Sequence, residues 1–426
     1  MPNRSPRFAI VSTGTEILQG LYPDTNAQFL AAQLSAMGYE VAAQAAAPDF
    51  EEAIEETLRS LFGRVDMILM TGGLGPTLDD AARPAAAKLW NAPLQHDERA
   101  WRMIEERFRG RYRAIPESNR RQTQIPSGAI ALYNNNGTAP GFILEGAAGR
   151  PALAALPGPP REMRPMFLEQ VAPYLARAFP PVLCQAILEI HTVGRSESDL
   201  NERVADLFGA RPDVNVGLLA EGGMVKARLT LRAQSAEALA ALRSEMLKEI
   251  RRRIGPEDIW GLDDETLAGN LGRLLAQRGW TIAVAESCTG GLISAALTDV
   301  PGASAYVKRG YVAYSDEAKV ELLGVREQTL AAHGAVSAET AAEMADGARA
   351  AARADVGLSV TGVAGPSGGT PEKPVGLVWY GVSTERGTET FSTRFPGDRA
   401  LIRRYSTIRA LDMVRRRLLR EYPLEA

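Results

Sequence analysis

The sequence is poor in the residues that cross-link small secreted proteins or hold metal clusters. Only two cysteines, Cys184 and Cys288, and three histidines occur among its 426 residues. Two thiols this far apart in the chain are too few for a disulfide framework or a cysteine-rich metal site. We therefore expect both cysteines to be reduced thiols.

Long apolar runs and a strong charge of one sign are also missing. No apolar segment approaches the length needed to cross a bilayer, and the segment before the first predicted strand is short and polar. We therefore expect a cytoplasmic protein with no membrane association. The formal net charge is −3, from 48 basic and 51 acidic residues. A dedicated nucleic-acid binder carries a basic surface, so this balance argues against direct nucleic-acid binding.

The remaining composition is that of a globular protein with more than one domain. Hydrophobic residues make up 45% of the chain and charged residues 23%, which is ordinary for a folded protein. A chain of 426 residues exceeds what one hydrophobic core usually organises, so two or three domains are expected. Prolines are dense between residues 151 and 181, which indicates that the first domain closes near residue 170, and residues 255–264 have the composition of a linker.

Apolar, strand-like runs alternate with helical apolar spacing in both the N-terminal and the C-terminal parts of the chain. Such alternation favours a mostly parallel sheet with helices on both faces. The middle segment combines three strand-like runs with two helical ones. The predicted fold is therefore α/β, with two mostly parallel three-layer α/β domains at residues 1–170 and 256–426, joined by a small α+β domain at residues 171–255.

A glycine-rich turn stands at the start of the C-terminal domain. A predicted strand at residues 281–285 leads into Glu286-Ser-Cys-Thr-Gly-Gly291, and a helix is expected to begin near Leu292. Such a turn leaves backbone N–H groups free at the positive end of a helix dipole, which suits a phosphate or a developing oxyanion. The alternative is a turn of small residues that only packs closely on a sheet.

Two further segments point to the same crevice. The predicted strand at residues 356–360 runs into Thr361-Gly-Val-Ala-Gly-Pro-Ser-Gly-Gly369, a second loop that is able to present N–H groups and hydroxyls. Between the two loops lie Tyr314 and Lys319, which are able to enter the crevice. Two such loops at strand ends are consistent with a site that binds a phosphate and carries out a reaction.

With these motifs the whole chain resembles the bacterial competence/damage-inducible protein A family. The C-terminal part resembles the family's nicotinamide mononucleotide deamidase domain through AESCTGG, YSDEAK and TGVAGPSGG, which start at Ala285, Tyr314 and Thr361. The resemblance implies hydrolysis of nicotinamide mononucleotide to nicotinate mononucleotide and ammonia by a serine–lysine amidohydrolase that needs no cofactor. Its serine–lysine pair falls on Ser287 and Lys319.

The chemistry of amide hydrolysis is compatible with this assignment. It needs an activated nucleophile, a base and donors for the oxyanion, and a serine with a neutral lysine meets the first two needs if burial lowers the lysine pKa. Cys288 is the alternative nucleophile, although it lacks an obvious base because His333 is the only histidine of this domain; a packing role for Cys288 is the other alternative. The predicted catalytic residues are Ser287, Lys319, Tyr314 and Thr361, and the predicted substrate contacts are Glu286, Cys288, Thr289, Gly290, Gly291, Gly362, Gly365, Arg399 and Arg403.

The two arginines of that set have a separate rationale. Arg399 and Arg403 are able to supply charge to a nucleotide phosphate through bidentate contacts. An ion pair on the surface of a helix is the alternative for each of them.

A second glycine-rich loop, Thr71-Gly-Gly-Leu-Gly-Pro-Thr-Leu-Asp-Asp80, follows a buried strand in the N-terminal domain. Its backbone suits an anion, but two adjacent carboxylates would repel a phosphate, so a divalent cation (Mg, Mn or Co) is the natural mediator. Glu16 and Asp49 stand at other strand ends, where they either complete the ligand set or cap helices. The predicted metal ligands are Asp80, Asp79, Asp49 and Glu16.

This N-terminal part resembles the molybdopterin-binding fold of molybdenum cofactor biosynthesis proteins, which in the competence/damage-inducible protein A family has been linked to ADP-ribose pyrophosphatase activity. The resemblance rests on the loop at residues 71–80 and on further small and polar residues, and it implies substrate contacts from Gly72, Gly73, Gly75, Thr77 and Asn26. The family tends to continue after the two aspartates with leucine and threonine, whereas this chain has Ala81-Ala82, so a hydroxyl is missing there. Molybdopterin binding is the alternative function of the same loops.

The middle segment resembles the family's KH-like connecting domain, but it has no Gly-x-x-Gly loop between residues 171 and 255. Because RNA-binding KH domains clamp the backbone with that loop, we expect a structural or interfacial role. The resulting hypothesis is a homodimeric enzyme of pyridine nucleotide recycling that acts on nicotinamide mononucleotide and ADP-ribose. The alternative is a protein linked to competence or DNA damage that binds a nucleotide or molybdopterin without turnover.

Overall fold

The structure is a computed structural model that describes residues 5–109, 115–147, 149–180, 182–207, 209–221 and 223–422. The chain divides into two compact units. One comprises residues 1–186 and 231–242, and the other residues 187–230 and 243–426.

The first unit is built on a six-stranded sheet with the order β2-β1-β3-β8-β7-β6. The strands β2, β1, β3 and β8 are parallel, and β7 and β6 continue the sheet antiparallel. Every residue of β3 is buried, as expected for a central strand covered on both faces. The strands are β1 (Arg7–Thr13), β2 (Glu40–Ala47), β3 (Met67–Thr71), β6 (Ile130–Leu132), β7 (Gly141–Leu144) and β8 (Ala152–Leu156).

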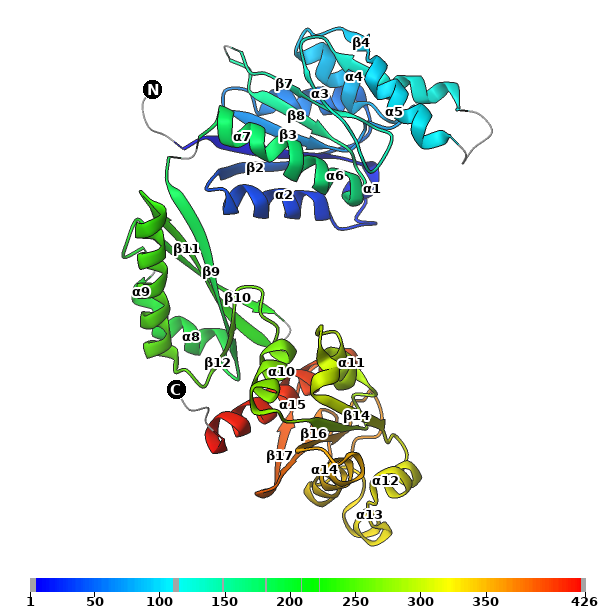
Figure 1. The fold of residues 1–426 in the computed structure, drawn as a ribbon, viewed down its shortest axis with the longest axis vertical. Helices are drawn as coiled ribbons and strands as arrows, with labels where there is room; N and C mark the ends of the chain where they lie inside the picture. Colours follow the sequence, from blue (N-terminus) through cyan, green and yellow to red (C-terminus); the bar gives the residue numbers. More distant parts are fainter. Residues whose placement is uncertain are drawn as a thin grey trace. The chain divides into compact units, whose positions relative to one another are not determined.

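Helices cover both faces of this sheet. One hydrophobic core contains Ile54 of α3 and Ala85 of α4, and the other contains Leu30 of α2 and Met163 of α6, so the two helix pairs lie on opposite faces (Figure 1). The helices are α1 (Thr15–Leu18), α2 (Thr25–Ala36), α3 (Glu51–Ser60), α4 (Ala82–Leu89), α5 (Glu98–Phe108), α6 (Pro160–Met166) and α7 (Ala172–Ala178), with short helical segments η1 (Glu117–Thr123) and η2 (Phe167–Val171) and a small pair of strands, β4 (Leu94–His96) and β5 (Gln124–Pro126).

The middle of the chain forms a four-stranded sheet with the order β10-β11-β9-β12. The division between the compact units falls inside β9, β11 and α9. The strand β12 pairs antiparallel with β9, and the mixture of strands and helices confirms the predicted small α+β fold. The elements are β9 (Cys184–Val193), α8 (Glu197–Val204), η3 (Ala205–Leu207), β10 (Val214–Glu221), β11 (Met224–Ala233), α9 (Ala236–Ile254) and β12 (Ile259–Leu262).

The C-terminal sheet has five strands in the order β14-β13-β15-β16-β17. Its first three strands are parallel, while β15, β16 and β17 are antiparallel to one another. The predicted α/β class is confirmed, but the expected alternation of strands and helices fails after β15. Only two residues separate β16 from β17, and a connection this short joins antiparallel strands. The strands are β13 (Ile282–Glu286), β14 (Val307–Val312), β15 (Val356–Gly362), β16 (Leu377–Thr384) and β17 (Gly387–Arg394).

Two groups of helices cover this sheet because its strands bury alternate residues on opposite faces. Ile282 and Val284 of β13 belong to the core that also contains α10, α11 and α15, whereas Ala283 and Ala285 face α12 and α14 (Figure 1). The helices are α10 (Leu267–Arg278), α11 (Leu292–Thr298), α12 (Asp316–Leu323), α13 (Glu327–His333), α14 (Ala338–Ala352) and α15 (Arg399–Glu421), with a short segment η4 (Ala303–Ala305).

The alanine-rich helix α14 packs very closely on the sheet. A Cβ atom at Gly357 would stand 2.1 Å from the carbonyl oxygen of Ala345, and one at Gly381 would stand 2.4 Å from that of Ala341. These two positions therefore admit no side chain, which gives a physical reason for glycine in both strands.

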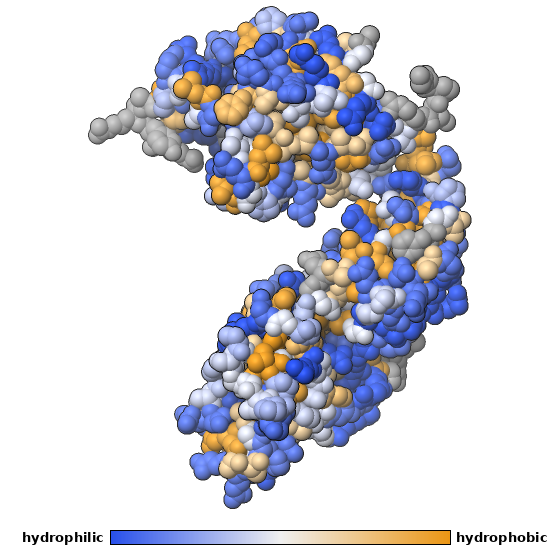
Figure 2. Space-filling model, turned by 180° about the vertical axis from the view of Figure 1, so that it is seen from behind, coloured by the Kyte–Doolittle hydropathy of each residue, from blue (hydrophilic) through white to orange (hydrophobic). Residues whose placement is uncertain are grey.

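The surface is mostly hydrophilic in the view of Figure 2, and apolar residues appear there in small patches. Among the described residues, none of the helices is long and apolar enough to span a membrane.

Candidate active site

The turn after β13 is organised by the carboxylate of Glu286. This side chain is fully buried, and its two oxygens accept hydrogen bonds from the N–H groups of Gly291 (2.9 Å), Ile293 (3.0 Å) and Ser294 (2.8 Å) and from the Ser294 hydroxyl (2.7 Å). A carboxylate at this position satisfies the free N–H groups of the first turn of α11. The predicted substrate contact of Glu286 is therefore corrected to a capping role that fixes the shape of the turn.

Ser287 follows directly and keeps its hydroxyl free. Its N–H donates to the carbonyl of Val360 at 2.9 Å, which joins the turn to the end of β15, and the residue is 8% exposed. Within the described part of the chain, the Ser287 hydroxyl has no hydrogen-bond partner. The left-handed backbone of Gly290 and Gly291 then turns the chain into α11. The backbone of Ser287 is thus fixed by hydrogen bonding, while its side-chain hydroxyl is free.

Lys319 is a buried cation near this turn. It is 1% exposed, its Nζ donates to the carbonyls of Tyr314 and Ser315 (3.2 Å each), and the carboxylate of Asp316 lies 3.6 Å away. Burial lowers the pKa of Lys319, while Asp316 raises it, as does an electrostatic interaction with Cys288, the residue after Ser287. No hydrogen bond joins Ser287 to Lys319 among the described residues, and such contacts often tighten only when substrate is bound.

Cys288 is a poor nucleophile in this environment. It is buried, and loss of hydration raises the pKa of its thiol to about 12, although its own N–H and that of Thr289 act in the opposite direction. A thiol with this pKa carries almost no thiolate at neutral pH. The geometry therefore favours Ser287 over the alternative nucleophile and gives Cys288 a packing position in the core.

Thr289 offers the turn a second free hydroxyl. The residue is fully buried, and its Oγ1 has no hydrogen-bond partner within the described chain. Neither its backbone N–H nor that of Cys288 donates to a backbone carbonyl there. A buried polar group without a partner is costly, and the Thr289 hydroxyl is such a group at this turn.

The loop that follows β15 supports the turn, but the hydroxyl of Thr361 is bound to the protein backbone. Thr361 Oγ1 donates to the carbonyl of Ala335 at 2.7 Å, so the predicted catalytic role is corrected to one that fixes the loop between α13 and α14. A Cβ atom at Gly362 would stand 2.8 Å from the Leu377 carbonyl, and one at Gly365 would stand 2.7 Å from Val375. Both glycines are thus required for close packing of this loop.

The first turns of α15 fasten these loops together. Arg403 donates to the carbonyls of Cys288 (3.1 Å) and Thr289 (2.8 Å). Arg399 donates to the carbonyl of Gly365 (2.9 Å) and to the hydroxyl of the exposed Tyr314 (3.0 Å). Neither arginine forms an ion pair with a described residue, which removes the surface ion pair as the alternative. Their established contacts are to the protein backbone and to Tyr314, and any phosphate contact would use their remaining N–H groups.

Sequence reasoning missed Asp316 and Ser294. Asp316 stands three residues before Lys319 on α12 and opposes the effect of burial on its pKa. Ser294 shares the carboxylate of Glu286. Only the spacing of Asp316, one helical turn before the lysine, was available as a signal in the sequence.

In the first unit, the carboxylate of Asp80 organises the loop at residues 71–80. It accepts hydrogen bonds from the N–H groups of Gly75 and Thr77, each at 2.7 Å, and from the Thr77 hydroxyl. The carboxylate of Asp49 accepts the N–H of Thr15 at 2.8 Å. Asp49 thus satisfies the first N–H of α1, in line with the capping alternative, whereas Asp80 fixes the loop itself.

The predicted metal ligands do not assemble into a metal site. Among the described residues there is no group of three or more histidine, cysteine, aspartate or glutamate side chains that could hold a metal ion. Asp80 and Asp49 already accept backbone N–H groups, Asp79 is hydrogen-bonded to Thr77, and the carboxylate of Glu16 lies against Gly14. The four carboxylates, as arranged, do not fit a bound divalent cation.

Asn26 joins the loops at the carboxyl ends of the central strands. Its side-chain amide donates to the Thr71 hydroxyl (3.0 Å) and to the Gly158 carbonyl (2.6 Å), and its buried Oδ1 has no partner among the described residues. Gly72 and Gly73 adopt left-handed backbone beside it, and a Cβ atom at Gly72 would stand 2.4 Å from the Thr13 carbonyl. Asn26 is thus a positioning residue with one free acceptor.

A pocket of about 490 Å³ opens beside this loop, and Asp49, Thr77, Asp80, Arg83 and Arg121 are among its lining residues. Arg83 is buried and donates to the carbonyls of Leu74 (2.8 Å) and Arg121 (3.1 Å), and burial lowers its pKa to about 10. Its Nε has no partner within the described chain. The sequence reasoning missed both arginines, which bring positive charge to a pocket that it had treated as acidic.

The fold and these two sites define a class of three-module α/β proteins, with an α+β module between two α/β modules. Models of three families match the chain: "Probable molybdopterin binding domain" at residues 9–177, "Damage-inducible protein CinA KH domain" at residues 189–261 and "CinA C-terminal domain" at residues 264–418.

Similar proteins match the chain over nearly their full length. A competence-damage inducible protein of Caldicellulosiruptor bescii is 42% identical over 410 residues, which cover 96% of this chain and 98% of the relative. A CinA-like protein of Kosmotoga olearia is 41% identical over 410 residues, with the same two coverages. The crystal structure of the competence/damage inducible protein CihA from Agrobacterium tumefaciens is 44% identical, covers 34% of this chain and 90% of its own, and has a TM-score of 0.34. The chain belongs to the CinA family of competence/damage-inducible proteins.

Proposed function

We propose that the C-terminal module hydrolyses nicotinamide mononucleotide to nicotinate mononucleotide and ammonia, with Ser287 as nucleophile and Lys319 as base. The observation that carries the proposal is the free hydroxyl of Ser287 next to Cys288, which interacts electrostatically with the buried Lys319, whose pKa is lowered by burial. A serine and a neutral lysine provide the nucleophile and the base that an amide requires.

In the proposed reaction, Ser287 Oγ attacks the carboxamide carbon while the neutral Lys319 amine takes the hydroxyl proton. The Thr289 hydroxyl and free N–H groups of the turn stabilise the negative oxygen that develops. Lys319 then returns the proton to the departing amine, ammonia leaves, and the acyl group remains on Ser287. Water, deprotonated by Lys319, attacks this ester, and the carboxylate product and the free serine are formed.

Two features support the rest of the proposal. Arg399 and Arg403 clamp the loops around the turn, which holds the reacting groups in place. Cys184 and Cys288 are both free thiols, as expected for a cytoplasmic enzyme. We also propose that the protein works as a homodimer, which sedimentation analysis of the purified chain tests.

The experiment measures ammonia released from nicotinamide mononucleotide by the full chain. The Ser287→Ala variant is expected to lose activity by about three orders of magnitude or more, because both the nucleophile and the acyl intermediate are lost. The matched control is Cys288→Ala at the next position, which should retain activity within about tenfold. If the wild type releases no ammonia, the deamidase proposal fails and the alternative, a protein that binds a nucleotide without turnover, is supported. If Ser287→Ala keeps full activity, Cys288 is the nucleophile.

A second candidate function concerns the first unit, which we propose to be an ADP-ribose pyrophosphatase. The pocket beside Asp80 supports this reading, because Arg83 and Arg121 provide the positive charge that a pyrophosphate requires. Molybdopterin binding uses the same loops and remains its alternative.

The test for this unit measures AMP formed from ADP-ribose, without metal and with Mg, Mn or Co added. Asp80→Asn is expected to abolish AMP formation, because asparagine keeps only one of the two acceptor oxygens that shape the loop at residues 71–80. Asp66→Asn, outside the pocket, is the control. Absence of AMP with every added metal would contradict the pyrophosphatase, and binding of molybdopterin by the same sample would support the alternative.

A further inference from the structure

A separate cavity of about 350 Å³ lies in the C-terminal compact unit, where the α+β module meets α15 and β17. Its lining residues include Val193, Gly223, Phe395, Tyr405 and Arg409. None of the residues that line it belongs to the turn around Ser287 or to its partners. Its volume is within the range of pockets that take small organic molecules.

Aromatic side chains form the wall of this cavity. The rings of Phe395 and Tyr405 lie 5.7 Å apart between centroids and are tilted by 56°. A Cβ atom at Gly223 would stand 2.7 Å from the Tyr405 ring, so the glycine lets the ring lie directly on the backbone of the α+β module. Walls of this kind favour a flat, apolar guest over a bare inorganic ion.

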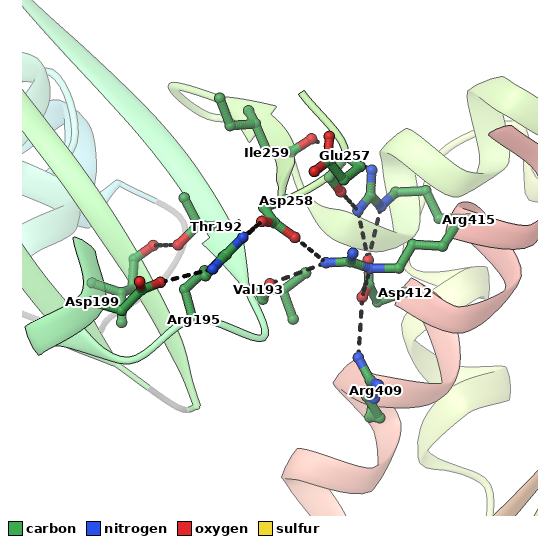
Figure 3. A network of polar contacts seen from close by, with 12 residues as sticks. Thr192, Val193, Arg195, Asp199, Glu257, Asp258, Ile259, Arg409, Asp412 and Arg415 are labelled. Carbon is green, nitrogen blue, oxygen red and sulfur yellow. Dashed lines mark hydrogen bonds and ion pairs between the residues drawn. The ribbon is translucent and has the colours of Figure 1, made fainter. Parts of the chain in front are cut away.

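The arginine that lines the cavity, Arg409, is less well paired than its neighbours. Asp412, which is fully buried, accepts hydrogen bonds from Arg415 (2.9 and 2.7 Å) and Arg416 (2.7 Å), whereas Arg409 approaches it only to 3.6 Å (Figure 3). Among the described residues Arg409 makes no hydrogen bond. Asp258, the other buried carboxylate of the network, is shared by Arg416 and Arg195.

The guanidinium of Arg409 therefore brings to the cavity a positive charge that its long ion pair with Asp412 (3.6 Å) balances only in part. Asp412 has its two oxygens occupied by Arg415 and Arg416, so it neutralises Arg409 only weakly. A partly buried charge gains most from a partner that brings an opposite charge and two acceptor oxygens.

We propose that this cavity is a binding site for a small planar aromatic monoanion of the carboxylate class. The ring of the ligand occupies the space beside Phe395 and Tyr405, and its carboxylate accepts hydrogen bonds from Arg409. Binding at this site is independent of the proposed deamidase, because the two sites share no residue.

Titration calorimetry of the full chain with benzoate tests the proposal. Benzamide, which has the same shape without the charge, is expected to bind at least about tenfold more weakly, because it loses the charge-assisted contact. Arg409→Gln should weaken benzoate binding by about the same factor. The matched control is Arg404→Gln, an exposed arginine on the same helix that does not line the cavity, and it should bind benzoate like the wild type.

Two further variants make the outcome decisive. Ile408→Trp fills the cavity and should abolish binding while the circular dichroism spectrum is unchanged, and Ser287→Ala should bind benzoate with wild-type affinity. The proposal is overturned by any of three results: no saturable benzoate binding to the wild type at millimolar concentrations, equal binding of benzamide, or loss of binding in Ser287→Ala with retention in Arg409→Gln.

Discussion

The substitution Asp412→Asn tests how strongly the buried ion network stabilises the C-terminal unit. Asp412 is fully buried and holds Arg415, which is itself 1% exposed, through two hydrogen bonds to one oxygen and Arg416 through the other. Asparagine keeps one acceptor oxygen but turns an amide toward the second guanidinium. One buried arginine thus loses its counter-charge, which typically costs about 3–5 kcal/mol.

A single unfolding free energy is poorly defined for a chain with several modules, so the measurement should be local. Arg415 also donates to the Glu257 carbonyl (2.6 Å) and Arg416 to the Val193 carbonyl (3.2 Å), so α15 and the segment before β12 should open together. Amide hydrogen exchange in peptides from 257–262 and 408–418 should accelerate by about 100- to 1,000-fold, the factor that corresponds to about 3–4 kcal/mol.

The control for this prediction is Asp299→Asn, an exposed aspartate outside the network that should change exchange by less than about threefold. If the peptides of Asp412→Asn exchange as slowly as those of the control, the network contributes no net stability and our reasoning fails. If only α15 accelerates, the network does not join the α+β module to it.

Three further predictions follow from the site and the sheet. The Asp316→Asn variant lacks the charge that raises the Lys319 pKa. Ammonia release increases as the Lys319 amine loses its proton, so its pH profile should shift to lower pH. The control Glu321→Gln, at an exposed carboxylate on the same helix, should leave the pH profile unchanged. Glu286→Gln should speed exchange in residues 287–298 by about tenfold or more and reduce ammonia release, because the N–H of Ser294 loses its charged acceptor; wild-type exchange there would contradict the capping role. Gly357→Ala should destabilise β15 by about 1–3 kcal/mol, because its Cβ meets the Ala345 carbonyl. The control Gly217→Ala, whose Cβ would have its nearest neighbour 3.9 Å away, should not be destabilised. Equal amide hydrogen exchange in the two variants would refute the packing argument.

Strand-end motifs were the part of the site that the sequence predicted well. A strand, a glycine-rich turn and a helix are local features, and the spacing around Ser287 and the loop after Thr361 is enough to place both at one edge of a parallel sheet. Burial of Lys319 was the condition under which the sequence made it a base, and burial does lower its pKa.

The roles of individual polar side chains were harder to predict, because they depend on which way each side chain turns. Glu286 and Thr361 stand in the motifs next to Ser287 and Gly362, yet both bind backbone groups of the protein. A carboxylate before a glycine-rich turn is equally consistent with a substrate contact and with a helix cap, and only the positions of the N–H groups decide between them. The burial of Arg83 could not be predicted from the sequence, because arginines are usually exposed.

One helix connects the candidate active site with the rest of its compact unit. Arg399 and Arg403 are four residues apart on α15 and clamp the loops around Ser287, while Asp412, Arg415 and Arg416 on later turns bind the α+β module. Because a helix is a stiff element, the position of these clamps depends on contacts made several turns away. A fragment that begins at residue 264 would lack the Glu257 and Ile259 carbonyls and the Asp258 carboxylate, and so would leave Arg415 and Arg416 with Asp412 as their shared acceptor. The α+β module therefore completes the polar core of α15 and holds this helix in place.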